Sequence, residues 1–242
     1  MTLYSGTLSF TPGAEALVGR FPFFAEVPPQ QISRIVTHIQ PRSFAPGVIL
    51  FHQDMPCSGI LYMIFSGWVR VYSIGRTGQE LTHTILGQGE ILGEMSLLDH
   101  KNHSATALTI TKTEVWLLPG VDFEEMLERY PPVSKALTAV LVQRLRSAIH
   151  HAESLAFQDV LGRLAYEILS LADRHGKMVG DCVEINFPLT QGELATMVGA
   201  TRESVNKAFS ALRVKNLVSF ESASIIVLNL SGLKRVVYER GR

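Results

Sequence analysis

The stretch Gly89–Ala107, GEILGEMSLLDHKNHSATA, carries residue types that suit a site for a small anion. Its glycines allow tight backbone turns, and Glu94 could accept a hydrogen bond from a hydroxyl group of a ligand. The small pair Ser104 and Ala105 would leave backbone N–H groups open to a negative charge. An anion site also favours a permanent cation, yet His103 stands directly before the small pair. The residues around this stretch must therefore decide which ligand, if any, it binds.

The size and composition of the chain are those of a folded protein. Its 242 residues suffice for one large or two modest domains, and 46% of them are hydrophobic. The chain has no apolar run of about 18 residues, and residues 1–10 lack the cationic and apolar segments of a signal peptide. We therefore expect a cytoplasmic protein without a membrane span.

The two cysteines, Cys57 and Cys182, form no metal motif. They lie far apart in the sequence without Cys-x-x-Cys spacing, which excludes a zinc or iron–sulfur site made only of the cysteines of one chain. Such cysteines are usually reduced, buried thiols. The sequence predicts no metal site.

Charge is distributed unevenly, although the formal net charge is zero. Residues 201–242 contain eight basic and three acidic side chains, a net charge of +5, so the preceding 200 residues carry −5. A basic end attached to an acidic body is typical of a protein that contacts a polyanion through that end. The C-terminal segment is therefore a candidate for binding nucleic acid.

Residues from about 42 to 118 alternate short β-prone runs with glycines. The turn signals recur every 8–12 residues or so, which is typical of antiparallel β-structure. The runs are VILFH, ILYMIFSG, WVRVYSI, ELTHTIL and EVWLLP. Segments with helical periodicity flank them at residues 28–40 and 121–131. The pattern predicts an α+β protein that begins with an antiparallel β-roll and has helices packed on the ends of the roll.

A long helix is predicted from Val133 to about Phe157, where no glycine or proline interrupts the chain. Apolar residues repeat there at steps of four and three and form an a/d seam. The seam consists of Leu141, Leu145, Ala148, Ala152 and Leu155. Because it covers barely two heptads, an amphipathic helix lying on its own domain is one interpretation. Pairing with the same helix of a second chain is the other, and the small alanines suit close approach.

The segment LTQGELATMVGATRESVNKAFSALRVKNLVSF predicts two helices joined by a tight turn. Thr190 and Glu193 have the spacing of a capping box, Gly199 ends the first helix, and the second begins at Thr201. Inward-facing residues are expected at Leu194, Met197, Val198, Val205, Ala208, Phe209 and Leu212. The following run, LVSFESASIIVLN, predicts a two-stranded wing. The features predict a winged helix-turn-helix, and a surface helical hairpin with a charged face is the simpler alternative.

Three features together resemble the cAMP receptor protein/fumarate-nitrate regulator (CRP/FNR) family of bacterial transcription regulators. They are the glycine-punctuated roll, the long helix that ends in LAFQDVLGRLA, and the pattern T-x-x-E-L-A-x-x-V-G-A-T-R-E-S-V-N-K. The resemblance covers about residues 21–229. It implies an effector-sensing domain at 1–131, a dimerisation helix at 132–158 and a winged helix-turn-helix domain at 159–242. It also implies a homodimer that binds a palindromic operator in double-stranded DNA, contacts RNA polymerase and is not an enzyme.

The resemblance places the main DNA contacts on the second helix of the helix-turn-helix. The candidate residues are Thr190, Thr201, Arg202, Glu203, Ser204, Asn206 and Lys207. Arginine and lysine can donate to guanine in the major groove, and glutamate can accept from cytosine. Lys207 departs from the arginine that is frequent at this position in the family. A bidentate contact is thereby lost, and we expect relaxed specificity.

Relatives that bind cAMP carry a cassette in which an arginine before Ser-Ala neutralises the phosphate. The effector candidates implied here are Gly93, Glu94, Met95, His103, Ser104, Ala105, Arg144 and Ala148. His103 occupies the arginine position, and an imidazole with a pKa of about 6.5 is largely neutral at about pH 7. Ala148 and Ile149 stand where cAMP-binding relatives place a hydroxyl pair against the base. We therefore expect a regulator that does not respond to cAMP.

Other effectors stay open at this point. An iron–sulfur cluster is not expected, because no cysteine precedes Cys57. Haem is an alternative, which would make the protein a gas sensor of the same fold, since haem needs only an axial ligand and an apolar slot. The histidines available are His83, His100, His103, His150 and His151, and a CO sensor of the family would place its ligand near Gly93–Met95. Another small anion or metabolite, or no ligand, completes the alternatives.

Two further classes of protein are alternatives. A cupin-like metalloenzyme fused to a DNA-binding tail could use His83, Glu94, His100 and His103, but the expected pair of histidines one residue apart is missing. A cyclic-nucleotide-binding module of a larger enzyme is disfavoured by the helix-turn-helix. The sequence leaves open the operator and whether the protein activates or represses.

Overall fold

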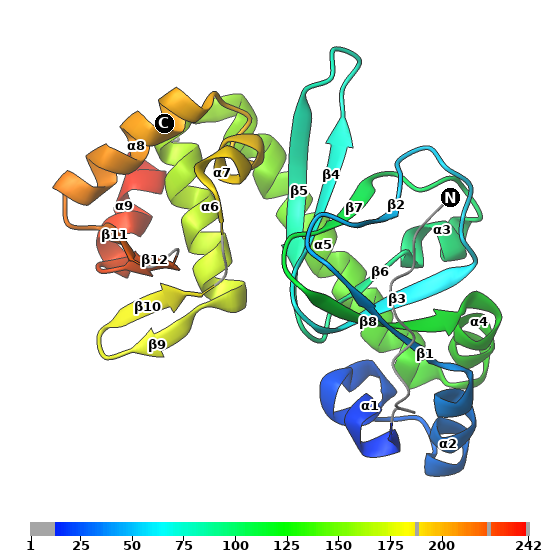
Figure 1. Ribbon diagram of the computed structural model, residues 1–242. Coiled ribbons are helices and arrows are strands. Elements are labelled where there is room, and N and C mark those ends of the chain that lie inside the picture. The colour runs from blue at the N-terminus through cyan, green and yellow to red at the C-terminus, as the bar shows by residue number, and fades with distance from the viewer. Residues whose placement is uncertain (1–12, 187–188, 222–223, 241–242) are drawn as a thin grey trace. The chain divides into compact units, whose positions relative to one another are not determined.

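A computed structural model describes residues 13–186, 189–221 and 224–240 of the chain (Figure 1). The described residues form two compact units. Unit 1 contains residues up to Gly78 and His83–Arg144, and unit 2 contains Gln79–Thr82 and the residues from Leu145 onward. The α+β fold predicted from the sequence is confirmed. No helix among the described residues is long and apolar enough to cross a membrane.

Unit 1 is built around two four-stranded antiparallel sheets, with strand orders β1-β8-β3-β6 and β2-β7-β4-β5. The strands are β1 (Gln40–Phe44), β2 (Ile49–Phe51), β3 (Ile60–Ser66), β4 (Val69–Ile74), β5 (Glu80–Leu86), β6 (Ile91–Leu92), β7 (Thr106–Thr109) and β8 (Thr113–Pro119). Five of them, β2 to β5 and β8, coincide with the predicted β-prone runs. The other three were missed because β1 and β7 are short and mostly polar and β6 has two residues.

Two hydrophobic clusters fill unit 1. One contains inward side chains from both sheets, including Ile64, Val69 and Val115, as the two-residue period of strands requires. The other packs the N-terminal helices and α4 against the outer side of β3 and β8, around the fully buried Trp116. The helices of this unit are α1 (Ala14–Arg20), the short 3₁₀ helix η1 (Pro22–Phe24), α2 (Pro29–His38), α3 (Glu94–Asp99) and α4 (Gly120–Arg129). The two predicted flanking helices correspond to α2 and α4.

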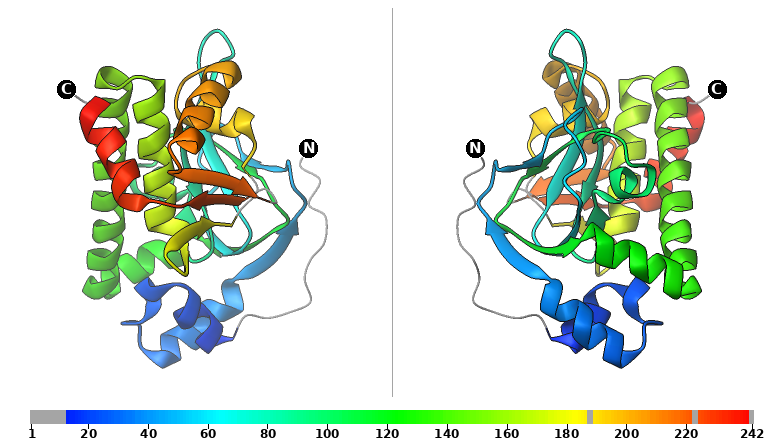
Figure 2. Two further views of the ribbon diagram at one scale, coloured as in Figure 1. Left: turned by 90° about the vertical axis from the view of Figure 1, so that its left-hand side faces the viewer. Right: turned by 90° about the vertical axis from the view of Figure 1, so that its right-hand side faces the viewer.

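Helix α5 (Pro131–Phe157) is the long helix that the uninterrupted sequence predicts, and it runs as one unbroken rod in both views of Figure 2. Its first residues belong to unit 1, where Val133 and Leu137 are buried in the core. The division between the units falls inside this helix, after Arg144. The segment 132–158, which the resemblance assigns to dimerisation, lies almost wholly within this helix, and that role stays a prediction.

The described residues of unit 2 form the last part of α5, four further helices and a four-stranded antiparallel sheet with strand order β11-β12-β10-β9. Its elements after α5 are α6 (Val160–His175), β9 (Lys177–Val179), β10 (Cys182–Ile185), α7 (Gln191–Met197), α8 (Arg202–Val214), β11 (Val218–Glu221), β12 (Ser224–Val227) and α9 (Leu230–Arg240). The predicted wing is the β11–β12 hairpin. The hairpin β9–β10, which joins the same sheet, and the final helix α9 were not predicted.

Candidate functional site

Helices α7 and α8 form the predicted helix-turn-helix, and both of their N-termini are capped by threonine. The Thr190 hydroxyl accepts from the Glu193 N–H at 3.1 Å, and the Glu193 carboxylate accepts from the Thr190 N–H at 2.7 Å. The Thr201 hydroxyl accepts from the Ser204 N–H at 3.2 Å. These local hydrogen bonds satisfy amide groups that would otherwise lack a partner in the first turns. The predicted capping box and the start of the second helix at Thr201 are confirmed.

The turn between α7 and α8 depends on Gly199. Its φ of 58° lies in the left-handed region, which residues other than glycine rarely adopt. A Cβ at this position would also lie 3.1 Å from the Leu155 side chain at the end of α5. The glycine therefore both permits the turn and allows it to pack against the long helix.

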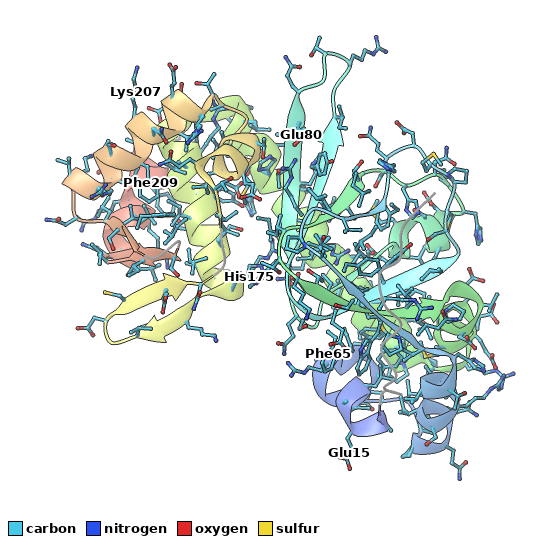
Figure 3. The ribbon with its side chains drawn as sticks, viewed as in Figure 1. Glu15, Phe65, Glu80, His175, Lys207 and Phe209 are labelled. Carbon is cyan, nitrogen blue, oxygen red and sulfur yellow. The ribbon has the colours of Figure 1, made fainter. Side chains whose placement is uncertain are left out.

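Helix α8 buries one face and exposes the other. Val205, Ala208, Phe209 and Leu212 are buried as predicted, and the Phe209 ring meets Phe220 of β11 edge-on at 6.1 Å. The side chains of Arg202, Glu203 and Lys207 are exposed. Figure 3 shows Lys207 and Phe209 on opposite sides of the helix. The exposed face thus presents long polar side chains from the first two turns of α8, as direct reading of bases in the major groove requires.

Three of the proposed DNA contacts are less available than the sequence suggested. Asn206 is only partly exposed, and its Oδ1 is buried and has no hydrogen-bond partner among the described residues. Its position on α8, at the border of the buried stripe, explains this burial. The hydroxyls of Thr190 and Thr201 are already engaged in their caps. Arg202, Glu203 and Lys207 are accordingly the freest of the candidates.

The predicted effector cassette contains a helix that the sequence did not indicate. The stretch Gly89–Ala107 was interpreted as turns and loop, whereas Glu94–Asp99 forms α3 between β6 and β7. Gly93 caps this helix with a φ of 87°, and a Cβ there would lie 3.0 Å from the Ile60 carbonyl oxygen. The close approach to β3 explains why the position needs glycine. The glycine thus serves backbone packing at the start of α3.

Glu94 and Arg144 form a partly buried ion pair in unit 1. The Glu94 side chain is 2% exposed, and its Oε1 lies 2.5 Å from Arg144 Nη1. Arg144 Nη2 also donates to the Ile91 carbonyl oxygen at 2.5 Å. The guanidinium therefore fixes both the start of α3 and the start of β6 to α5. The structure brings these two predicted effector residues together and gives the carboxylate a protein partner.

His103 is buried at 2% exposure and makes hydrogen bonds through both ring nitrogens. Nε2 accepts from the Ser58 N–H in a long hydrogen bond of 3.4 Å, so Nδ1 carries the proton and donates to Ser96 Oγ at 2.9 Å. The ring also stacks on Phe51, with centroids 4.0 Å apart. Burial lowers the pKa of His103 below its ordinary value of 6.5. The imidazole is therefore a neutral, internally bonded group.

The other predicted effector residues lie in different surroundings. Ser104 is exposed, whereas Ala105 is buried directly before β7. Met95 is on α3 and 53% exposed, so it faces away from the buried Glu94. Ala148 is exposed on α5, one turn after Arg144, and belongs to unit 2. Within unit 1 the structure thus gathers Gly93, Glu94 and Arg144 at the start of α3.

The apolar seam of α5 is divided between buried and exposed positions. Leu141 packs partly against the core of unit 1, and Leu155 is half-buried in unit 2. Leu145 is 61% exposed, and the small Ala148 and Ala152 are exposed too. Val142 and Ile149, which the predicted seam did not include, are also large exposed apolar residues. A continuous exposed stripe on α5 therefore runs through Val142, Leu145, Ile149 and Ala152.

The histidines considered as haem or metal ligands do not converge in the described parts of the chain, where no three His, Cys, Asp or Glu side chains could hold a metal ion. His83 Nε2 is bonded to Ser73 Oγ at 2.9 Å, and His100 is exposed after α3. His150 pairs with Glu153 at 3.1 Å and His151 with Glu167 at 2.8 Å. His83, His150 and His151 thus each have a protein side chain as a hydrogen-bond partner.

Sequence reasoning missed the partners of His103. Ser58, Ser96 and Phe51 come from three different segments, and only the fold brings them to the imidazole. Tyr62 of β3 extends the group, with its ring 5.3 Å from that of Phe51 and its hydroxyl 3.4 Å from Ser58 Oγ. One signal could have indicated a partner for His103. Ser96 is a polar residue at a buried position of α3.

Comparisons with known proteins agree with this architecture. Residues 41–130 match the family model for the cyclic nucleotide-binding domain, and residues 162–236 match that for the Crp-like helix-turn-helix domain. The CRP-like cAMP-activated global transcriptional regulator of Mycobacterium tuberculosis is 31% identical over 221 residues, covering 91% of this chain and 98% of the relative. The cyclic AMP receptor protein of Thermus thermophilus is 32% identical over 217 residues, covering 90% and 97%.

A solved structure supports the same fold. FixK2 from Bradyrhizobium japonicum superposes with a TM-score of 0.73 at 22% identity, covering 82% of this chain and 96% of that structure. The Mycobacterium tuberculosis relative is named as a transcriptional regulator. The matching domains, the extent of the relatives and the exposed polar face of α8 lead to one assignment. The chain belongs to the CRP/FNR family of DNA-binding bacterial transcription regulators.

Proposed function

We propose that the protein is a homodimeric transcription regulator that binds palindromic duplex DNA and does not respond to cAMP. The observation that carries the second part is His103, which is buried, neutral and bonded at both ring nitrogens. The named relatives are activated by cAMP or are cAMP receptors. A regulator of the same architecture without a cation at this position would respond to a different effector or to no effector.

The exposed residues of α8 support the DNA-binding part of the proposal. Arg202 and Lys207 can donate to guanine O6 and N7, and Glu203 can accept from cytosine N4. The net charge of +5 over residues 201–242 adds attraction to phosphates that does not depend on sequence. Because Lys207 offers a point charge where arginine would offer a fork, base discrimination at its contact is weaker.

The exposed stripe of α5 supports the homodimer. Val142, Leu145 and Ile149 repeat at steps of three and four residues, and the small Ala152 continues the series. This spacing is that of an a/d seam, which is covered when the same helix of a second copy packs alongside. A symmetric dimer would present two copies of α8 to half-sites about one helical turn apart. RNA polymerase is the proposed further partner.

The absence of a cAMP response is supported by the chemistry of the cassette. A phosphate gains much more from a charged, bidentate guanidinium than from a neutral donor. His103 offers at best a neutral ring, and both of its nitrogens already have protein partners. Glu94 is likewise paired with Arg144.

Selection of duplexes from a randomised library, with and without cAMP, tests the proposal. We expect the same palindromic sequence to be enriched under both conditions, with equal affinity in a subsequent gel-shift titration. Enrichment that requires cAMP would contradict the non-responsive part. Recovery of no preferred sequence under either condition would contradict specific DNA binding by the free protein.

A further inference from the structure

We propose that His103 makes the cassette responsive to protons: the neutral imidazole holds the 54–58 loop and α3 in place, and its protonation releases them. This inference deepens the regulation of the site described above. Only its consequence for DNA binding rests on the proposed function. The release itself is a property of unit 1.

His103 joins the 54–58 loop to the rest of the roll through three hydrogen bonds. Its backbone N–H donates to the Met55 carbonyl oxygen at 2.9 Å, and its carbonyl oxygen accepts from the Asp54 N–H at 2.8 Å. Its ring nitrogen Nε2 accepts from the Ser58 N–H. Because the ring also bonds Ser96 of α3, a single residue connects the loop with that helix.

Backbone strain lies at both ends of this connection. Asp54 has a φ of 63° and His100 a φ of 54°, both in the left-handed region that non-glycine residues rarely occupy. Such conformations persist only where surrounding contacts determine them. Asn102 Nδ2 adds one such contact, since it donates to the Asp54 carbonyl oxygen at 2.7 Å. Loss of the ring contacts would let these segments relax to ordinary backbone conformations.

Protonation at Nε2 removes the hydrogen bond to Ser58. The new N–H would face the Ser58 N–H, so two donors would meet without an acceptor. The positive ring would also remain buried at 2% exposure and stacked on Phe51. A buried charge without a counter-charge is strongly unfavourable. The protonated state therefore favours an arrangement in which the imidazole reaches water and the loop opens.

Among the described residues around His103, no buried carboxylate is free to compensate the charge. The titratable or charged residues on the neighbouring elements are His52, Asp54 and Cys57 on the preceding loop, Tyr62 on β3, Glu94 and Asp99 on α3, and His100 and Lys101 on its own loop. Glu94 is buried, but Arg144 engages it. Asp54 and Asp99 are exposed, and Asp99 is 3.7 Å from Lys101. The lowered pKa of His103 is caused by burial, which agrees with this geometry.

A route from the imidazole to the long helix is present in the same unit. Ser96, which accepts from His103, lies two residues after Glu94 in the six-residue helix α3. Glu94 in turn binds Arg144 of α5. Release of Ser96 would loosen α3 and with it the Glu94–Arg144 ion pair. The proton would then act on the helix that carries the proposed dimer seam.

Hydrogen exchange of the full chain, read by mass spectrometry at about pH 7.5 and about pH 5.5, tests the switch. After correction for intrinsic exchange rates, we expect the protection of the 54–60 peptide to fall about tenfold at the lower pH. In the opened loop the imidazole has the ordinary pKa of about 6.5, so the uptake of one proton acts over the one pH unit between about 6.5 and about 5.5. His103→Gln keeps an acceptor and a donor without titrating in this range, and we expect its protection to be independent of pH. A matched control is His100→Asn, which removes a neighbouring exposed histidine and tolerates the left-handed backbone.

Several outcomes are decisive. The switch is supported if wild type and His100→Asn lose protection at the lower pH while His103→Gln does not. It is overturned if wild-type protection is unchanged, or if His103→Gln shows the same loss. Should His103→Gln be poorly folded, Ser96→Ala provides the second variant. It removes the Nδ1 partner in both protonation states, so we expect lower protection of the 54–60 peptide at both pH values. Protection equal to that of wild type at about pH 7.5 would also overturn the proposal.

A DNA-binding arm separates this proposal from the proposed function. A duplex selected at about pH 7.5 is titrated with protein at both pH values. We expect the Kd for this duplex to change more between the two pH values for wild type than for His103→Gln. If exchange shows the switch but no duplex is ever selected, the proposed function fails and the switch stands. If a duplex is bound and the exchange profile is flat, the switch fails and the proposed function stands.

Discussion

The imidazole of His103 lies flat against the phenyl ring of Phe51, with ring centroids 4.0 Å apart and planes 15° from parallel. This stack, together with the bonds to Ser58 and Ser96, makes His103 part of the packed interior. In this position the His103 side chain stabilises the packing of the cassette. The position for which the family resemblance implies a phosphate-binding arginine is thereby used for packing in this chain.

The stability of the protein should depend on pH through His103. Burial lowers the pKa of His103 in the folded state, so the unfolded chain takes up this proton first as pH falls. The contribution of the neutral ring is present above about pH 6.5, and it is lost as pH drops below 6.5 toward the folded-state pKa. Urea unfolding across this range should show a steeper loss of stability for wild type than for His103→Gln. Equal slopes for the two proteins would contradict the assignment.

Replacing Leu145 with glutamate should disrupt the proposed homodimer. Leu145 is 61% exposed on the stripe of α5, and a charge buried in a helix–helix seam is unfavourable by several kcal/mol. Sedimentation velocity should show monomers for Leu145→Glu and dimers for wild type. Val121→Glu is the matched control, since Val121 is 73% exposed on α4, outside the stripe. An unchanged dimer in Leu145→Glu would place the dimer contact elsewhere.

Arg202→Ala should weaken binding to a selected duplex by roughly 1–3 kcal/mol and have little effect on random DNA. The reason is that Arg202 stands exposed at the first position of α8, where a bidentate contact to guanine is possible. Arg213→Ala removes an exposed arginine from the other end of the same helix and serves as the control. Anisotropy titrations measure both. An equal loss on specific and random duplexes would mean that Arg202 contacts only phosphate.

Gly199→Ala should destabilise unit 2 by more than Gly180→Ala does. Both glycines have left-handed φ angles, 58° and 61°, so both variants suffer backbone strain of about 1–2 kcal/mol. A Cβ at position 180 meets open space, whereas at position 199 it would lie 3.1 Å from Leu155. Thermal unfolding of the two variants separates strain from crowding. Equal losses would show that the Leu155 side chain simply moves aside.

The helix-turn-helix was predictable because its signals are local. Thr190, Glu193 and Thr201 cap their helices through neighbours three residues away, and Gly199 permits the turn by its own φ. Interactions between residues this close in sequence can be recognised from a short stretch of the chain. The buried stripe of α8 follows from the same helical period.

The cassette was less predictable because its contacts are distant in sequence. His103 is 45 residues from Ser58, and Glu94 is 50 residues from Arg144. The helix α3 has only six residues, too few for a periodic signal. The residue types indicated an anion site, and the role of His103 as a packed, neutral group emerged only once the strands had brought Phe51 beside it. The strand β1, whose second residue is Pro41, was missed because its pattern is polar and it lies at the edge of its sheet.

The most direct test of the central claim is a calorimetric titration of the wild-type protein with cAMP, beside the variant His103→Arg. We predict no heat of binding for wild type at micromolar cAMP, because the neutral, internally bonded His103 cannot neutralise the phosphate. The arginine variant should gain weak binding, limited by Ala148 and Ile149, which offer no hydroxyl to the base. Tight binding of cAMP by the wild-type protein would contradict the account, since other residues of the cassette would then have to hold the phosphate.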